Sequence, residues 1–176
     1  MARISLIEKD RHPELADLIA WISSGRRGRL LNVYRLLLHS PPLATTWFEH
    51  IGAVRWRTQL DGRLREMVII RIALLNRIEY VIRQHVPELA AAEGLTAEEC
   101  DALGDWPASG RFSEREQAAL AYADAMCRAA QVPDPIFDGL RGHFGEREIV
   151  ELTVLIGTYI MHTRVFGALE IDLERA

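Results

Sequence analysis

The amino-acid sequence predicts an all-α fold, a helical bundle of about eight helices forming one domain over residues 1–176. Apolar residues recur at three- and four-residue intervals through most of the chain, which is the helical period. Two capping boxes, beginning at Thr96 and Ser113, each predict the start of a helix. The sequence lacks the sustained alternation that is typical of strands, and its length allows a sizeable core.

The first half of the chain is predicted to form five helices. Pro13 suits the first turn of the first helix. The run Ser40-Pro41-Pro42 should stop the second, and Asp61 should cap the fourth. Pro87 lies inside the fifth helix and should kink it, because proline removes a backbone donor. The helices are expected at about residues 13–23, 30–38, 43–58, 62–77 and 78–93.

The second half of the chain is also predicted to be helical. The capping box at Thr96 opens a short helix to about residue 103, and residues 104–111 are expected to form a loop around Pro107 and Gly110. The capping box at Ser113 opens a helix to about residue 130. Two more helices are expected, at residues 133–144 and 146–173. The last is strongly apolar but contains Glu151 and other polar residues, which favours a core helix over a membrane span.

Composition and charge narrow the classes of partner. The net charge is −4 and no large basic field is present, so a nucleic-acid partner is disfavoured. No membrane association is predicted. The short apolar stretch near the N-terminus contains Asp17 and does not resemble a signal peptide. Cys100 and Cys127 are far apart, and free thiols in such a chain predict a cytoplasmic protein.

The sequence predicts neither a metal nor a cofactor. Its histidines do not occur at the i, i+4 spacing of a helical zinc site, and the motifs HExxH and CxxC are both absent from the sequence. Chemistry, if present, would therefore depend on ordinary side chains.

Two polar residues, Glu66 and His85, lie on apolar helical faces. Glu66 lies in the run LREMVIIRIALL, which is apolar almost all round. His85 occupies the i+7 place of an apolar stripe whose other members are Ile78, Val81, Ile82, Val86 and Leu89. A buried carboxylate and a buried imidazole are costly unless paired, so the two are predicted to pair. The pair could transfer protons to or from a bound organic acid, or it could be a structural salt bridge with a core histidine.

Four other residues are candidates for a site. Tyr80 could hydrogen-bond a substrate or simply pack its ring, and Arg71 could bind a substrate carboxylate or pair with Glu66. His162 is interpreted as a core or subunit-interface histidine. Cys127 is interpreted as a small buried apolar residue.

Four further segments are informative when they are taken in order. They are LREMVIIRIA, EYVIRQHVPELAAAEGL, FSEREQAALAYADAM and ELTVLIGTYIMHTRV. In this order they resemble the carboxymuconolactone decarboxylase family, which shares an all-helical superfamily with the alkylhydroperoxidase-D-like proteins, and the similarity extends over about residues 30–173. The resemblance implies an alkylhydroperoxidase-D-like helical bundle. It matches the family's arginine-glutamate pair to Arg65 and Glu66, and the family's site histidine to His85.

The resemblance also exposes two departures from the family pattern. The two cysteine positions of the peroxidase branch fall on Ile78 and Val81, so this chain is a variant without the CxxC motif. In the decarboxylase-like branch a tyrosine-glutamate pair precedes the histidine. Tyr80 matches that tyrosine, but Val81 replaces the glutamate.

The resemblance and the residues together imply a cofactor-free lyase that acts on a small lactone or organic acid. In this hypothesis His85 and Glu66 perform acid-base chemistry, while Tyr80 and Arg71 bind the substrate. One alternative is an alkylhydroperoxidase or peroxiredoxin-like antioxidant activity, which the missing CxxC disfavours. Another is a helical oligomer that binds a ligand without turnover. Family members and the apolar last helix both favour a homo-oligomer, either a dimer, a trimer or a hexamer.

Overall fold

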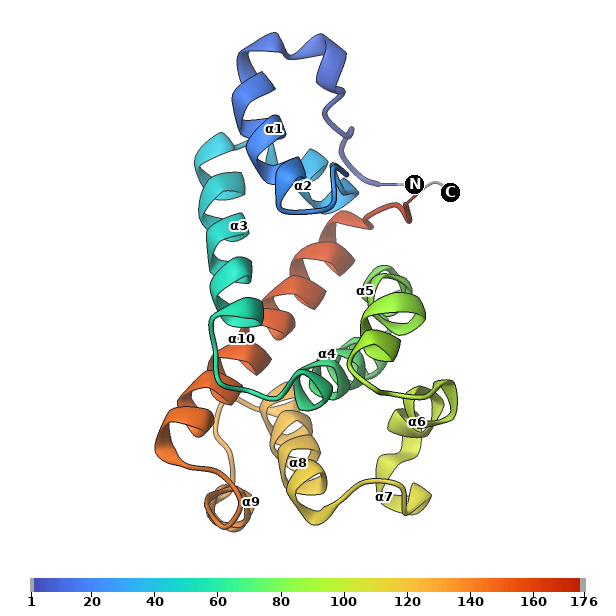
Figure 1. The fold of residues 1–176 in the computed structure, drawn as a ribbon, viewed down its shortest axis with the longest axis vertical. Helices are drawn as coiled ribbons and strands as arrows, with labels where there is room; N and C mark the ends of the chain where they lie inside the picture. Colours follow the sequence, from blue (N-terminus) through green and yellow to red (C-terminus); the bar gives the residue numbers. More distant parts are fainter. Residues whose placement is uncertain (1, 175–176) are drawn as a thin grey trace. The chain divides into compact units, whose positions relative to one another are not determined.

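The computed structural model describes residues 2–174 and confirms the all-α fold class. Within those residues the regular elements are ten α-helices, α1–α10, and four short 3-10 or π segments, η1–η4 (Figure 1). The chain forms two compact units. The first contains residues 2–57 and 166–174, and the second is Thr58–Val165. The expectation that residues 1–176 form a single domain stays a prediction.

The first unit consists of short helices and the end of the chain. Its elements are η1 (Lys9–Arg11), η2 (Pro13–Leu15), α1 (Ala16–Ser24), α2 (Asn32–Leu37) and α3 (Pro41–Trp56). Phe48 joins them, because its ring makes edge-to-face contacts with Trp21 at 4.6 Å and Tyr34 at 5.7 Å between centroids. The Asn32 side-chain amide holds the C-terminal segment by donating to the carbonyls of residues 172 and 173 at 3.2 and 3.1 Å.

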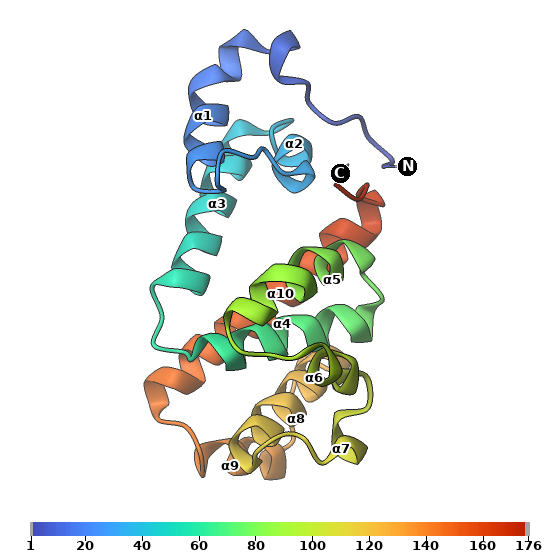
Figure 2. The same ribbon diagram turned by 45° about the vertical axis from the view of Figure 1, so that its right-hand side comes forward.

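The second unit is built around α4 (Gly62–Asn76), whose residues 64–73 are all buried (Figures 1 and 2). Helices α5 and α8 and segments η3 and η4 pack against α4. The elements after α4 are α5 (Glu79–His85), η3 (Val86–Ala90), α6 (Ala97–Ala102), η4 (Leu103–Asp105), α7 (Trp106–Ser109), α8 (Glu114–Arg128) and α9 (Asp134–Arg141). Helix α10 (Glu146–Leu169) continues from this unit into the first. A helix surrounded on all sides explains why LREMVIIRIALL is apolar almost all round.

Local capping fixes the starts of three helices, as the sequence predicts. The Asp61 carboxylate accepts from the Leu64 backbone N–H at the start of α4. The capping boxes at Thr96 and Ser113 are both complete, and they begin α6 and α8. These bonds join residues three positions apart, so the residue types that form them can be recognised from the local sequence.

The structure differs from the local expectations at three places. The helix expected at residues 78–93 is present as α5, which ends at His85, followed without a break by the π turn Val86–Ala90 and helical residues 91–92; the distortion expected at Pro87 is this π turn. Residues 104–111 are not all loop, because η4 and α7 lie there. Pro41 and Pro42 do more than stop α2, since they occupy the first turn of α3, where the missing N–H costs no hydrogen bond.

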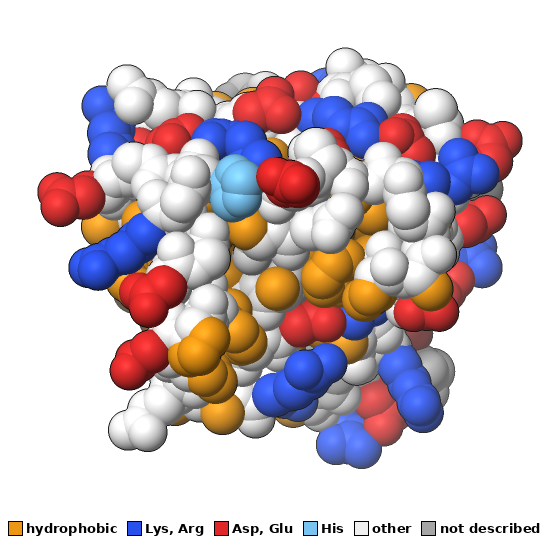
Figure 3. Space-filling model, turned by 90° about the horizontal axis from the view of Figure 1, so that it is seen from below, with side chains coloured by type: hydrophobic (Ala, Val, Ile, Leu, Met, Phe, Trp, Pro, Cys, Tyr) orange, Lys and Arg blue, Asp and Glu red, His pale blue; other side chains and the backbone are white. Residues whose placement is uncertain are grey.

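Within residues 2–174, α10 is the single helix that is long and apolar enough to cross a membrane. A core helix passes the same test, and 44% of the relevant window is buried. Figure 3 shows one face of the protein, on which acidic and basic side chains are interspersed with hydrophobic ones.

Candidate active site

The candidate site begins with Glu66 on the central helix of the second unit. Its side chain has no exposed surface, because α4 is covered on every side. The Asp61 cap fixes where α4 starts and hence which way Glu66 points. A carboxylate in such surroundings needs a cation or several donors.

His85 supplies that partner from the last residue of α5. Its Nδ1 lies 2.6 Å from the Glu66 Oε2 atom, and the residue is 6% exposed. The structure therefore brings together the two residues that the sequence predicts to pair. The distance is short for a nitrogen–oxygen hydrogen bond, as expected when one partner is charged.

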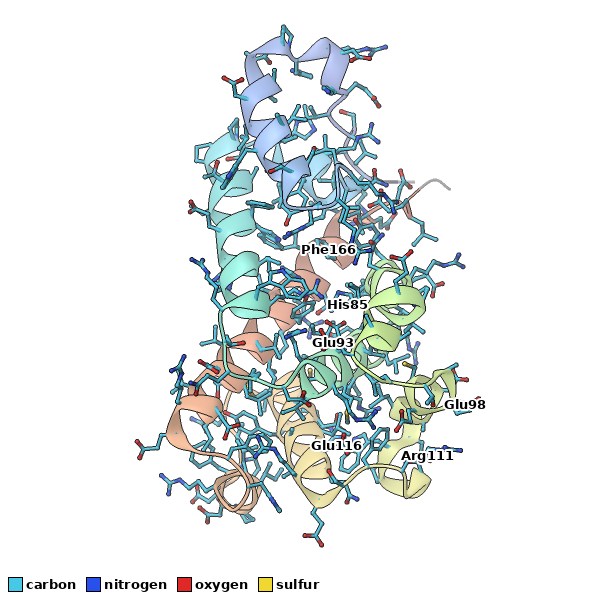
Figure 4. The ribbon with its side chains drawn as sticks, viewed as in Figure 1. His85, Glu93, Glu98, Arg111, Glu116 and Phe166 are labelled. Atoms are coloured by element: carbon cyan, nitrogen blue, oxygen red, sulfur yellow. The ribbon has the colours of Figure 1, made fainter. Side chains whose placement is uncertain are left out.

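Arg65 and Glu93 extend the pair toward solvent. The buried Arg65 has its Nε 3.6 Å from the other Glu66 oxygen, and its Nη2 donates to Glu93 at 2.7 Å. A Cβ atom added to Gly62 would lie 1.8 Å from a Glu93 carboxylate oxygen, so glycine allows Glu93 to approach the start of α4. Figure 4 marks Glu93 and His85 beside α4. The four side chains therefore form a series of contacts that runs from Glu93 through Arg65 and Glu66 to His85.

An aromatic residue that the sequence analysis did not single out, Tyr159 of α10, also contacts His85. The two rings are 5.7 Å apart between centroids with an interplanar angle of 83°. The same tyrosine ring contacts His162, one helical turn further along α10, at 4.8 Å and 64°. The signal in the sequence is the spacing of Tyr159 and His162, which puts both on one helix face, but nothing local reveals that this face meets α5.

Tyr80 and Arg71 have different surroundings. Tyr80 is buried on α5, one and a half turns before His85. Arg71 does not pair with Glu66. Its guanidinium donates to both carboxylate oxygens of Asp124 at 2.7 Å and to the carbonyls of Leu103 and Gly104 at 2.8 and 2.9 Å. These four bonds use most of the five N–H donors of the guanidinium, so Arg71 is a buried residue that links α4 to α8 and η4.

The two cysteines lie in different surroundings. Cys100 packs in a core cluster with Met67, Leu103 and Phe112. Burial raises the pKa of the Cys100 thiol, and burial also raises the pKa of the Cys127 thiol. Raised pKa values reduce the thiolate fraction, and the thiolate is the reactive form.

The arrangement of Glu66, His85 and Arg65 is suited to proton transfer. Imidazole accepts and donates protons near neutral pH, and a carboxylate on Nδ1 fixes which ring nitrogen carries the proton. Among the residues that the structure describes, no group of three or more histidine, cysteine or acidic side chains is placed to hold a metal ion.

The all-helical fold is similar to that of solved structures described as AhpD-like. The model of the Carboxymuconolactone decarboxylase family matches residues 41–125, which include both residues of the pair. The family model and the similar solved structures support the assignment of this chain to the carboxymuconolactone decarboxylase and AhpD-like superfamily.

The chain is also similar to individual proteins and solved structures. The uncharacterized protein YnjA of Escherichia coli K12 is 29% identical over 165 residues, covering 88% of this chain and 86% of YnjA. A structure from Agrobacterium tumefaciens, described as a putative antioxidant defence protein AhpD, is 25% identical with a TM-score of 0.75, covering 80% of this chain and 97% of that one. The AhpD core of a peroxidase-related protein from Ralstonia eutropha JMP134 has a TM-score of 0.83 at 18% identity, covering 98% and 92%.

Proposed function

We propose that this protein is a cofactor-free lyase that removes carbon dioxide from a small carboxylated lactone or related organic acid. The observation that carries the proposal is the 2.6 Å contact between the buried Glu66 carboxylate and His85 Nδ1. Such a pair holds a proton at a defined place in a site with little water. Membership of the carboxymuconolactone decarboxylase superfamily supports the choice of substrate class.

The proposed reaction needs one proton and no redox partner. The bond between the carboxylate carbon and the ring carbon breaks, carbon dioxide leaves, and the electron pair remains on the substrate as an enolate. The other ring nitrogen of protonated His85 then donates a proton to that carbon. Glu66 stabilises the imidazolium before the transfer and keeps the ring oriented afterwards. Solvent returns the proton to His85 and completes the cycle.

Tyr80 remains a proposed substrate-binding residue, whereas Arg71 does not, because its donors are bound to Asp124 and two carbonyls. We expect the working form to be a cytoplasmic homo-oligomer, a dimer, trimer or hexamer. The exposed side chains of Val150, Val154 and Met161 along α10 favour association. Light scattering after size-exclusion chromatography measures the subunit number.

The test is a screen of carboxylated lactones and oxo acids for release of carbon dioxide, using the wild type, His85→Gln and Glu66→Gln. We expect His85→Gln to lower kcat by about 10²–10⁴, the usual contribution of general acid-base catalysis. Glu66→Gln preserves shape but removes the charge, and we expect it to lower kcat with a smaller effect on KM. His143→Gln is the matched control, because His143 is partly exposed and lies at the far end of α9.

Turnover that survives His85→Gln would overturn the proposal. So would a screen in which the wild type releases no carbon dioxide from any member of the class. Circular dichroism of each variant confirms that lost activity does not come from lost folding.

A thiol peroxidase is the second candidate, because two of the similar structures carry AhpD in their descriptions. The raised pKa values of both thiols argue against it. An organic-hydroperoxide assay of the wild type and of the double variant Cys100→Ser/Cys127→Ser tests for thiol peroxidase activity. We expect the wild type to consume no peroxide; consumption that the double variant abolishes would favour the peroxidase.

A further inference from the structure

We propose that the exposed face of α10 binds the same face of a second copy of this chain, with the two helices antiparallel and crossing at Gly157. The inference rests on the homo-oligomer that the proposed function includes, but not on the lyase reaction. It concerns the part of α10 that belongs to the second unit, residues 146–165. A face that binds itself joins chains in pairs, so the number of subunits should be even.

Helix α10 is apolar on more than the face that it buries. Leu152 and Leu155 are fully buried, whereas Val150, Val154 and Met161 are 61%, 44% and 39% exposed. A helix that is apolar on all sides is normally covered on all sides. The residues that the structure describes cover the face of Leu152 and leave the face of Val154 exposed.

The exposed apolar residues form one stripe along α10. Its members follow one another at intervals of four, three and four residues, which is the spacing with which one helix packs along another. They are Val150, Val154, Gly157 and Met161. A Cβ atom added to Gly157 would have no atom within 4 Å, so the surface is open there and a second backbone can approach closely.

Charges beyond the two ends of the stripe favour an antiparallel second copy. Glu146 lies about one turn before the stripe and Arg164 about one turn after it, and both are exposed. With Gly157 on the twofold axis, Arg164 of one copy lies opposite Val150 of the other. Glu146 of that other copy is four residues, or about 6 Å, further along, which long side chains can span. A parallel arrangement would instead place Arg164 beside Arg164 and Glu146 beside Glu146.

The proposed contact has the composition of a small protein interface. Its centre is apolar and its rim is charged, as in other interfaces. The other cation at the start of α10, Arg147, donates to Glu151 of its own helix at 2.9 Å, which leaves Arg164 as the cation that would bind Glu146. One helix packed on its copy belongs to the smaller interfaces, below about 1,200 Å² in total, so we expect a dissociation constant in the micromolar range.

The experiment measures the subunit number of the full chain by light scattering and its dissociation constant by sedimentation equilibrium. Gly157→Leu places a bulky side chain at the proposed crossing, and the open space there should leave the fold of the single chain intact. Gly139→Leu is the matched control, because Gly139 is an exposed glycine of α9 that also has no atom within 4 Å of an added Cβ. Arg164→Glu and Glu146→Arg, alone and together, test the charge pairing.

We expect an even number of subunits in the wild type, which Gly157→Leu halves and Gly139→Leu leaves unchanged. Each charge reversal should raise the dissociation constant by about 10-fold, since symmetry affects two exposed ion pairs at once. The double reversal exchanges the two charges and should restore the dissociation constant to within about 3-fold. Circular dichroism should show the same helix content in every variant.

A wild type that is a monomer at about 100 µM, or a trimer, would overturn the inference. So would an even number of subunits that neither Gly157→Leu nor the charge reversals change, because another face would then join the chains. Cosedimentation of a monomeric wild type with phosphatidylcholine vesicles would assign the stripe to a lipid surface instead. The two proposals fail separately: a monomer with turnover removes this interface, whereas a paired chain without turnover removes the lyase.

Discussion

Replacing Arg71 with methionine tests whether this residue belongs to the site or to the framework. The guanidinium makes four bonds of 2.7–2.9 Å to Asp124, Leu103 and Gly104, and the side chains of Arg71 and Asp124 are 9% and 8% exposed. Methionine fills much of the same volume but donates none of these bonds. The variant would leave a buried carboxylate without its main partner and two carbonyls without a donor.

The expected loss of unfolding free energy is about 3–5 kcal/mol, the usual cost of removing one partner of a buried ion pair. At about 2–4 °C per kcal/mol for a chain of this size, the melting temperature should fall by roughly 10 °C. Urea titration followed by circular dichroism measures the loss. The double variant Arg71→Met/Asp124→Leu removes both charges and should recover at least half of the loss.

A loss below about 1 kcal/mol, together with a raised KM for organic acids, would refute this reasoning. It would return Arg71 to the substrate-binding role that the sequence suggested. An equal loss of unfolding free energy in the single and double variants would show that the loss comes from changed packing and not from leaving the Asp124 carboxylate without Arg71.

Two further changes have expected outcomes. In Gly62→Ala the new methyl group would lie 1.8 Å from a Glu93 carboxylate oxygen and must displace it, so the free energy of unfolding should fall by about 1–2 kcal/mol. The control is Gly139→Ala, because no atom lies within 4 Å of the new methyl group there, and this variant should be more stable by up to about 1 kcal/mol. Thermal melts measure both changes. The Arg63 guanidinium lowers the pKa of Glu99 from 4.5 to about 2. A lowered pKa stabilises the fold above pH 4.5, and this stabilisation is lost as the pH falls from 4.5 to 2. Because water reaches the pair, Arg63→Met should cost only about 1 kcal/mol at pH 7 and clearly less at pH 2, where much of Glu99 is protonated, as urea midpoints at the two pH values would show. Equal losses at the two pH values would contradict it.

The sequence was sufficient for features set by short-range rules. Asp61, Thr96 and Ser113 each bond a backbone N–H three residues away, so their helix starts are predictable. The pairing of Glu66 with His85 was predictable for another reason. Each lies on an apolar face of consecutive helices, and a buried charge needs a partner.

The features that were missed depend on contacts between distant residues. Arg71 and Asp124 are 53 positions apart, and nothing near Arg71 in the sequence distinguishes Asp124 from the nearer Glu66 as its partner. The approach of Tyr159 to His85 likewise depends on how α10 crosses α5. The π turn after His85 has a local cause in Pro87, but whether a helix kinks, ends or widens at proline depends on what packs around it.

That π turn restricts how the length of the chain can vary. Val86–Ala90 holds more residues per turn than an α-helix, and it lies between His85, which faces Glu66, and Glu93, which reaches Arg65. Each residue of an α-helix rotates the following side chain by about 100°. Deleting one residue here would therefore turn Glu93 away from Arg65 even if every remaining side chain were kept. Insertions and deletions should be accepted in exposed loops of this protein, but between His85 and Glu93 the number of residues is itself part of the site.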